Sequence, residues 1–192
     1  GVKAGSTYRI TTQGLLTPTS NRYDLAIEGR GFLQVLMPSG ETAYTRAGNL
    51  SVNDQGQLVT DDGYQIQPSI TIPQDAVDVS ISKTGQVQVI KADSPTPEVA
   101  GTIELAAFVN EAGLEAIGDN LYMESGASGP ATTGTPGSVG FGQIMQGYIE
   151  ASNVDAVSEI TALIVAQRAY EMNSKVISTA DEMLQAANQV KA

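Results

Sequence analysis

The 192-residue sequence predicts an α+β protein: a mostly antiparallel β-hairpin domain with extended arms and one long C-terminal helix of coiled-coil type. Two observations carry this prediction. From Tyr23 to about Met123, short runs of β-favouring residues alternate with turn signals. From residue 153 to residue 192 the chain contains neither Gly nor Pro, so a helix can continue without interruption.

The N-terminal residues 1–20 are polar and rich in Thr, Ser and Gly, which favours an extended arm or linker. Residues 21–124 are predicted to form the β domain. Inside it, Pro38-Ser39-Gly40 separates two β-like runs and indicates a hairpin. The run Ile70–Ile72 precedes Pro73, which limits it to an edge strand or the end of a strand.

Three further turns share one chemistry, in which Asn or Ser opens a type I turn and Gly takes the left-handed position that closes it. Each lies between two apolar β-like runs and predicts a hairpin. Their near-regular spacing is either an internal repeat or common turn chemistry, and we favour the second interpretation. The three turns are Asn53-Asp54-Gln55-Gly56, Ser82-Lys83-Thr84-Gly85 and Asn110-Glu111-Ala112-Gly113.

Residues 125–151 are predicted to be a Gly/Ser/Pro linker followed by an extended return segment. The stretch 125–142 consists almost entirely of small residues and carries no charged side chain, which is typical of a linker or long loop rather than of a core element. Residues 143–150 regain apolar side chains and are expected to form one more extended piece.

Residues 152–192 are predicted to form the long helix, which Ser152 and Asp155 begin in capping-box spacing. A helix of about 37 residues measures roughly 55 Å, which would overhang a β domain of this size. We therefore expect its apolar stripe to pack on another helix or molecule, with Asn173 fixing the register. The stripe comprises Ala162, Leu163, Ala166, Ala169, Tyr170, Asn173, Val176, Ile177, Ala180, Met183, Leu184, Ala187 and Val190.

The composition excludes several classes of function. The chain has no Cys and no His, which removes disulfides, thiolate nucleophiles and the commonest general base and metal ligand. Its net charge of −11 argues against binding to a nucleic-acid backbone. No catalytic residue, metal site or cofactor is predicted, and no apolar run is long enough for membrane insertion. The stretch 92–167 holds ten acids and no base, which either faces outward or serves solubility.

Several segments resemble the bacterial flagellar rod and hook family. The C-terminal signature consists of Ser152-Asn153-Val154 with the run Gln167-Arg168-Ala169-Tyr170-Glu171-Met172-Asn173-Ser174-Lys175. Further segments are similar to the distal-rod branch of the same family. They are Asp24–Phe32, Ala43–Gly48, Gln65–Pro68, Gly118–Tyr122 and Thr135–Gly137.

The resemblance implies a structural subunit without enzymatic activity or cofactor. It implies helical polymerisation into the distal rod, the drive shaft that crosses the periplasm and transmits motor torque to the hook. The implied partners are further copies of the chain, proximal rod proteins, the hook protein and the surrounding periplasmic and outer-membrane rings. The resemblance also implies export by the flagellar secretion apparatus without a cleavable signal peptide.

In this family a helix at the N-terminus, which carries an Asn-Leu-Ala-Asn signature, pairs with the C-terminal helix. That partner helix is absent from this sequence, and Gly1 stands where the family begins with Met, which favours a fragment. Three alternatives stay open. The chain could be a proximal rod or hook subunit of the same family, a secreted β-rich adhesion module with a coiled-coil stalk, or a glycan hydrolase that uses two convergent carboxylates.

Overall fold

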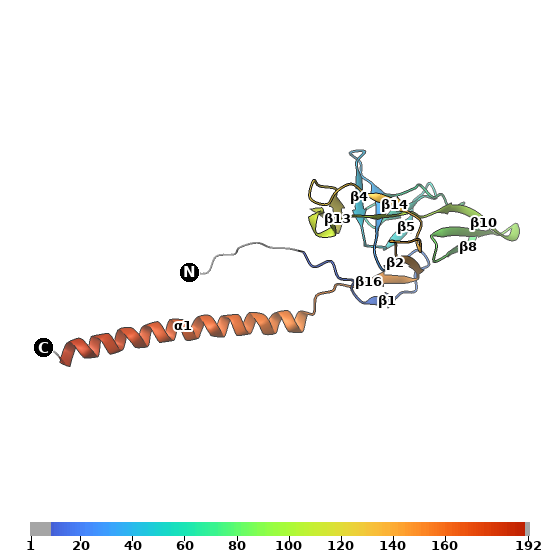
Figure 1. Cartoon of the computed structure of the whole chain (residues 1–192). Helices are drawn as coiled ribbons and strands as arrows, with labels where there is room; N and C mark the ends of the chain where they lie inside the picture. Colours follow the sequence, from blue (N-terminus) through green and yellow to red (C-terminus); the bar gives the residue numbers. More distant parts are fainter. Residues whose placement is uncertain (1–8, 191–192) are drawn as a thin grey trace. The chain divides into compact units, whose positions relative to one another are not determined.

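The computed structural model describes residues 9–190 and confirms the predicted α+β class. The chain divides into two compact units, Gly1–Ala151 and Ser152–Ala192. The first, which we call the β unit, contains the strands of the described residues, and every pairing among them is antiparallel. The second contains the helix α1, Ala156–Val190, which is drawn as one unbroken rod in Figure 1.

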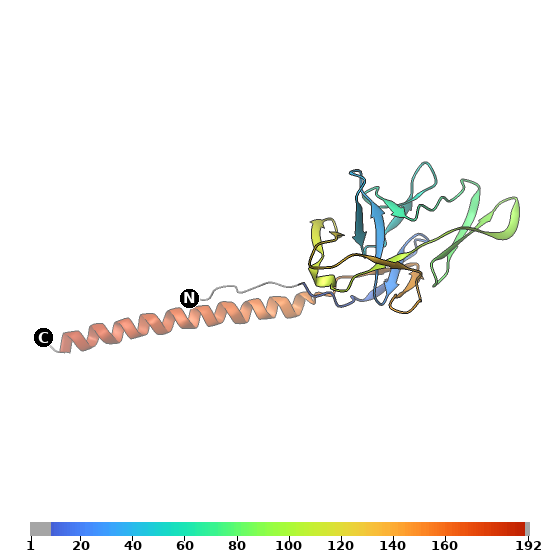
Figure 2. The same ribbon diagram turned by 45° about the horizontal axis from the view of Figure 1, so that its top comes forward.

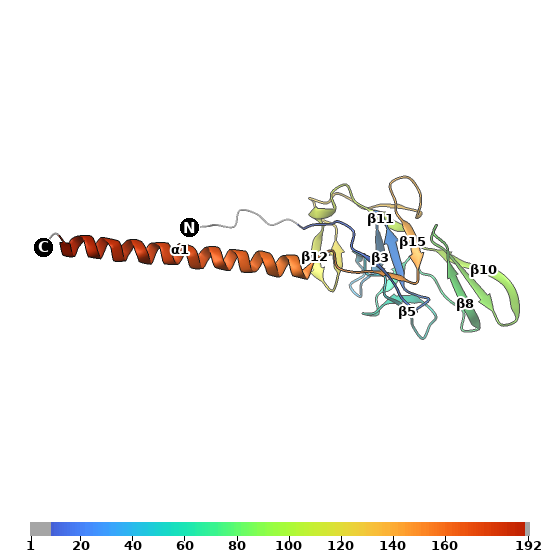
Figure 3. The same ribbon diagram turned by 90° about the horizontal axis from the view of Figure 1, so that it is seen from below.

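The largest sheet of the β unit has nine strands within residues 9–190. Its centre is β3, which pairs with β4, β7 and β11. Figure 3 shows β3 and β11 running through the middle of the unit. The strands are, in order, β12 (Glu115–Gly118), β13 (Leu121–Met123), β4 (Thr42–Thr45), β3 (Phe32–Leu36), β7 (Gln65–Gln67), β6 (Leu58–Thr60) and β5 (Leu50–Val52). In addition, β11 (Leu105–Ala107) pairs with β3, and β14 (Thr132–Gly134) pairs with β11.

Smaller sheets complete the described part of the β unit. A three-stranded sheet of β8 (Ala76–Ile81), β9 (Gln86–Lys91) and β10 (Ser94–Thr102) projects from it, as Figure 2 shows. The strand β2 (Leu25–Glu28) pairs with β15 (Gln143–Gln146). A last ribbon joins β1 (Leu16–Pro18), near the N-terminal end of the described chain, to β16 (Tyr148–Glu150), which leads toward the helix.

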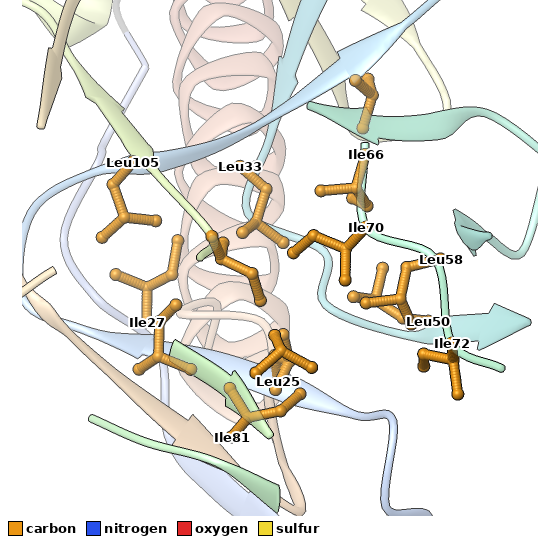
Figure 4. Close-up of a cluster of buried hydrophobic side chains, with 14 of the residues drawn as sticks. Leu25, Ile27, Leu33, Leu50, Leu58, Ile66, Ile70, Ile72, Ile81 and Leu105 are labelled. Carbon is orange, nitrogen blue, oxygen red and sulfur yellow. The ribbon is translucent and has the colours of Figure 1, made fainter. Parts of the chain in front are cut away.

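The core of the β unit lies between β2, the large sheet and the β8–β9 hairpin. In Figure 4 the side chains of Leu25 and Ile27 from β2 lie beside Ile81 and face the group around Leu33 and Ile70. Burial of these side chains follows from strand alternation, because every second residue of a strand faces the same side. A second, smaller cluster packs the rings of Phe32, Tyr44 and Phe108 edge to face, together with Ala106 and Leu114.

Three of the predicted hairpin turns are confirmed, because Gly40, Gly56 and Gly85 adopt φ angles of +87°, +80° and +81° between paired strands. The hairpin predicted at 110–113 is wrong. Residues Glu111–Gly113 form a short 3₁₀ helix, and β11 pairs with β3 and β14 rather than with β12. Gly113 is required there for close packing, since a Cβ would lie 2.6 Å from the backbone of Ala127. The run Ile70–Ile72 contributes an isolated bridge through Thr71, as expected of the end of a strand.

Residues 125–142 differ from the linker that their composition predicts. They contribute β14 to the large sheet, and Ser128 is buried with its hydroxyl hydrogen-bonded to the carbonyls of Ser125 and Gly129. Gly142 lies against β2, where a Cβ would come within 2.5 Å of the carbonyl oxygen of Glu28. Small residues are used here to bring backbones into contact, and composition alone does not distinguish that use from flexibility.

The helix α1 begins at Ala156, four residues later than predicted. Asp155 caps it: one carboxylate oxygen accepts a hydrogen bond from the Val157 N–H at 3.0 Å, and the other accepts from the Ser158 hydroxyl. The Ser152 hydroxyl accepts from the Val154 N–H and lies outside the helix. At 1.5 Å per residue, the 35 residues of α1 span about 52 Å. No helix among the described residues is long and apolar enough to cross a membrane.

Candidate assembly surface

The predicted stripe of α1 is exposed to solvent from Ala162 to Leu184. Its large members are Leu163, Tyr170, Val176, Ile177, Met183 and Leu184, each at least 64 % exposed. Covering a side chain of this size stabilises an assembly by about 1.5–3 kcal/mol. The stripe therefore has the chemistry of an association surface. The side chains of Ala187 and Val190 lie outside the described residues.

The structure exposes further large apolar side chains that the seven-residue pattern missed. Four of them, Val157, Ile160, Ile164 and Val165, lie in the first ten residues of α1. The fifth, Met172, lies near the middle of the helix. A heptad pattern keeps only rows that continue along the helix, so it passed over the short rows Val157–Ile164 and Val165–Met172, which end at Glu171 and Thr179. A count of apolar residues per turn would have found them. A helix that is apolar on several faces is typical of one that becomes buried on several sides.

The polar residues of the family signature lie on the exposed surface of α1 and just before it. The Gln167 amide donates a hydrogen bond to the Glu171 carboxylate at 3.2 Å. The two residues are four positions apart and therefore lie on adjacent turns of the helix. Arg168 and Lys175 are also exposed. Ser152, Asn153 and Val154 form the exposed connection between β16 and the helix cap. The role of these residues in assembly stays a prediction.

The two strands that lead out of the β unit are paired with each other. Leu16 lies opposite Glu150, and Pro18 lies opposite Tyr148. Beyond the strands the ladder continues, because the Ala151 N–H donates to the Leu15 carbonyl at 2.9 Å. The chain before β1 and the chain after β16 therefore leave the ribbon at the same end.

The described part of the predicted arm makes contacts with the β unit. The Gln13 side chain donates to the Ile27 carbonyl at 2.7 Å and accepts from the Gly29 N–H at 3.0 Å. Arg9 lies over the ring of Tyr122 with its guanidinium carbon 5.0 Å from the ring centroid. Residues 1–8 of the arm lie outside the described residues.

Arg46 and Glu150 form an ion pair next to this ribbon, with 2.8 Å between nitrogen Nη2 and oxygen Oε2. Their side chains are 21 % and 12 % exposed. Arg46 belongs to a segment that carries the family resemblance, but no local pattern in the sequence links it with Glu150. They are 104 positions apart, and only the three-dimensional structure shows the contact.

The titratable groups elsewhere in the β unit have the surroundings of structural rather than catalytic residues. Burial, together with a hydrogen bond to Glu124, raises the pKa of the Tyr44 hydroxyl well above its usual range. Asp61 and Asp62, which are adjacent in the chain, are both exposed. Within residues 9–190, no group of three or more acidic side chains is arranged to hold a metal ion.

Two long segments of the chain match known protein families. Residues 26–89, which run from β2 to β9, match the family described as the flagellar hook protein FlgE/F/G D1 domain. Residues 145–190, which contain β16 and α1, match the family described as the flagellar basal body rod FlgEFG protein C-terminal. The β unit and the helix therefore both define a protein of the flagellar rod and hook class.

Individual relatives narrow this class. The chain is 66 % identical over 192 residues to the flagellar basal-body rod protein FlgG of Caulobacter vibrioides, covering all of the chain and 73 % of that relative. It is 49 % identical to the FlgG of Agrobacterium fabrum, covering 95 % of the chain and 70 % of the relative. The flagellar hook protein FlgE of Salmonella typhimurium is 34 % identical over 95 % of the chain and 40 % of the hook protein. The chain belongs to the FlgG family of flagellar basal-body rod proteins.

Family membership removes two of the three alternatives that the sequence left open. The chain is a structural component of the flagellar basal-body rod and not an enzyme. This removes the glycan hydrolase and the secreted adhesion module. The exposed stripe of α1 and the paired exit strands are therefore features of an assembly protein rather than of a catalytic site.

Proposed function

We propose that this chain is a subunit of the distal rod, where it polymerises helically and transmits motor torque to the hook. The observation that carries the proposal is the exposed apolar stripe of α1, whose burial needs a partner of comparable length. The larger identity to rod proteins than to the hook protein supports a rod position over a hook position.

The stripe packs on a second helix in this proposal. Small side chains at Ala162, Ala166 and Ala169 let the two backbones approach closely, and the larger row that includes Tyr170 and Ile177 covers the joint. The paired exit strands support this arrangement, because a segment that precedes β1 starts beside the segment that leads into α1. The partner is a terminal helix of the same kind of subunit or a neighbouring copy.

The wider setting of the rod belongs to the same proposal. The rod spans the periplasm, and its subunits reach it through the flagellar secretion apparatus without a cleavable signal peptide. Proximal rod proteins and the hook protein adjoin its two ends, and the basal-body rings surround it. Torque passes through many subunit contacts at once, so each contact needs to supply only a modest share of the rigidity.

Assembly of the full-length protein with Ile177→Asp or Tyr170→Asp tests the proposal. Each change places a charge inside the stripe, and burying an unpaired charge costs several kcal/mol for every subunit that joins. We expect no filaments by electron microscopy, while the near-ultraviolet circular dichroism of the β unit is unchanged.

Ser178→Asp is the matched control, because Ser178 is the neighbour of Ile177 and lies on the polar side of α1. It adds the same charge without touching the stripe and is expected to leave filaments intact. Rods of normal length and straightness from both stripe variants would refute the proposed packing. Unmodified full-length protein that never forms filaments would refute helical polymerisation itself.

A further inference from the structure

The end of the β1–β16 ribbon is where any force on the terminal segments enters the β unit. Leu16 and Glu150 form its last strand pair, and the Ala151 N–H closes it by donating to the Leu15 carbonyl. Because both segments leave at this end, pulling them apart would open the ribbon one pair at a time. A three-residue pairing of this kind offers little resistance by itself.

Glu150 links both exit strands to the rest of the unit at this point. Its oxygen Oε1 accepts a hydrogen bond from the Gly14 N–H at 2.9 Å, and its oxygen Oε2 accepts from Nε of Arg46 at 2.9 Å. Each of the other ion pairs within residues 9–190 has at least one partner more than half exposed, whereas Glu150 and Arg46 are both largely shielded. Charge-assisted hydrogen bonds gain strength when water is excluded in this way.

Arg46 anchors the other side of the contact on a turn of β-unit backbone. Its Nη1 atom donates to the carbonyls of Gly29 and Gly31 at 3.1 and 3.0 Å, and Nη2 donates to the Ile27 carbonyl at 3.3 Å. The flanking glycines have φ angles of +108° and +134°, which other residues rarely adopt. Only a planar guanidinium fork can reach this many acceptors at once, so Lys does not replace Arg here.

We propose that Arg46 and Glu150 form a clamp that holds both exit strands on the β unit and carries the load when the segments beyond Leu15 and Ala151 are pulled apart. Both are positioning residues, and Gln13 adds two neutral hydrogen bonds on the side of the arm. The clamp is complete within one β unit. Its existence is therefore independent of the proposed polymer, in which it would be the place where load passes between the β unit and the terminal segments.

Single-molecule pulling on the monomer tests the clamp. The chain has no Cys, so Thr11→Cys and Val154→Cys give two unique attachment points outside the ribbon. Glu150→Gln keeps an acceptor for the Gly14 N–H but removes the charge that binds Arg46. We expect the lifetime of the ribbon under constant force to shorten about tenfold, in line with the loss of a charge-assisted hydrogen bond.

Glu98→Gln is the control, because Glu98 is paired with Lys91 in the sheet of β8, β9 and β10, which contains neither strand of the ribbon nor the turn that Arg46 binds. It should leave the lifetime unchanged. Arg46→Lys keeps the positive charge but loses the fork, and should shorten the lifetime at least as much as Glu150→Gln. Equal lifetimes for Glu150→Gln and Glu98→Gln, or a normal lifetime for Arg46→Lys, would overturn the clamp.

Amide hydrogen exchange separates a local clamp from a general loss of stability. In Glu150→Gln the Ala151 amide should exchange about tenfold faster, while the amide of Val35 at the centre of the large sheet keeps its wild-type rate. Equal acceleration at both amides would show that Glu150 merely stabilises the whole β unit and would overturn the proposal.

Discussion

Gly48→Ala is expected to destabilise the β unit strongly, because the position of Gly48 leaves no room for a Cβ. An added Cβ would lie 1.6 Å from the carbonyl oxygen of Leu25, whereas real Cβ atoms stay at least 3.0 Å from such an atom. The backbone around residue 48 would therefore have to move by about 1.4 Å, from the difference of these two distances. The conformation itself is not strained, since the φ angle of Gly48 lies outside the left-handed range.

The cost of this movement can be worked out from its neighbours. The Leu25 N–H donates to the Gly48 carbonyl at 2.8 Å, and Leu25 is only 1 % exposed. Displacement leaves a buried N–H without its acceptor, at about 1–3 kcal/mol. Overpacking of the surrounding side chains adds about 1–3 kcal/mol. The free energy of unfolding should therefore fall by about 3 kcal/mol or more, which is a large part of the stability of a typical domain.

Urea and thermal unfolding, followed by the near-ultraviolet signal of the tyrosines, measure this loss. A loss of about 3 kcal/mol corresponds to a decrease of roughly 10 °C in Tm for a unit of this size. Gly126→Ala is the control, because a Cβ at Gly126 meets nothing within 4 Å. It should be neutral or slightly stabilising. A Gly48→Ala variant with the unfolding free energy of Gly126→Ala would refute the reasoning from close approach.

Two further predictions concern a buried hydroxyl and a helix cap. Because folding raises the pKa of Tyr44 above its unfolded value, its contribution is complete below about pH 10 and is lost as the pH rises further. Tyr44→Phe should lower the free energy of unfolding by about 1 kcal/mol at neutral pH. It should also make the decrease of this free energy at alkaline pH shallower, which urea titrations between pH 7 and 11 would measure. The same dependence of the unfolding free energy on pH in Tyr44→Phe and wild type would contradict this assignment. Asp155→Ala removes the acceptor of the Val157 N–H and should cost the first turn of α1 about 1 kcal/mol, measured by amide exchange at Val157, with Asp155→Asn retaining most of the cap.

The sequence was most informative where structure depends on neighbouring residues. Gly40, Gly56 and Gly85 mark their turns because a left-handed φ is a local requirement that Gly satisfies. The long helix follows from the lack of Gly and Pro over many turns. The helix start was misplaced because Ser152 and Asp155 are both good caps, and only Asp155 lies within reach of the first free N–H groups.

Prediction failed where a contact joins distant parts of the chain. Gly113 has the same local chemistry as the confirmed turns at Gly56 and Gly85, but β11 finds its partners in β3 and β14. Gly142 looks like part of a flexible linker, yet it supports backbone contact with β2. The stripe of α1 could be predicted because it is periodic, whereas the clamp of Arg46 and Glu150 could not, because no local pattern links residues 104 positions apart.

The difference between local patterns and long-range contacts also changes the interpretation of the acidic stretch 92–167. Three of its ten acids form ion pairs with bases that lie outside the stretch: Glu98 with Lys91, Glu111 with Arg30, and Glu150 with Arg46. Two more have structural roles, since Glu124 binds Tyr44 and Asp155 caps α1. These acids therefore hold the chain together rather than present a uniform outward charge.

Exposed acids without such pairs gather elsewhere. Asp61, Asp62 and Asp119 line one surface hollow of the β unit, and none of them takes part in the ion pairs found among residues 9–190. Two of these three lie outside the stretch. Like charges at short distance repel an acidic neighbour most strongly where bases do not offset them. These three acids therefore make the hollow negatively charged, a grouping that the distribution of charge along the sequence does not indicate.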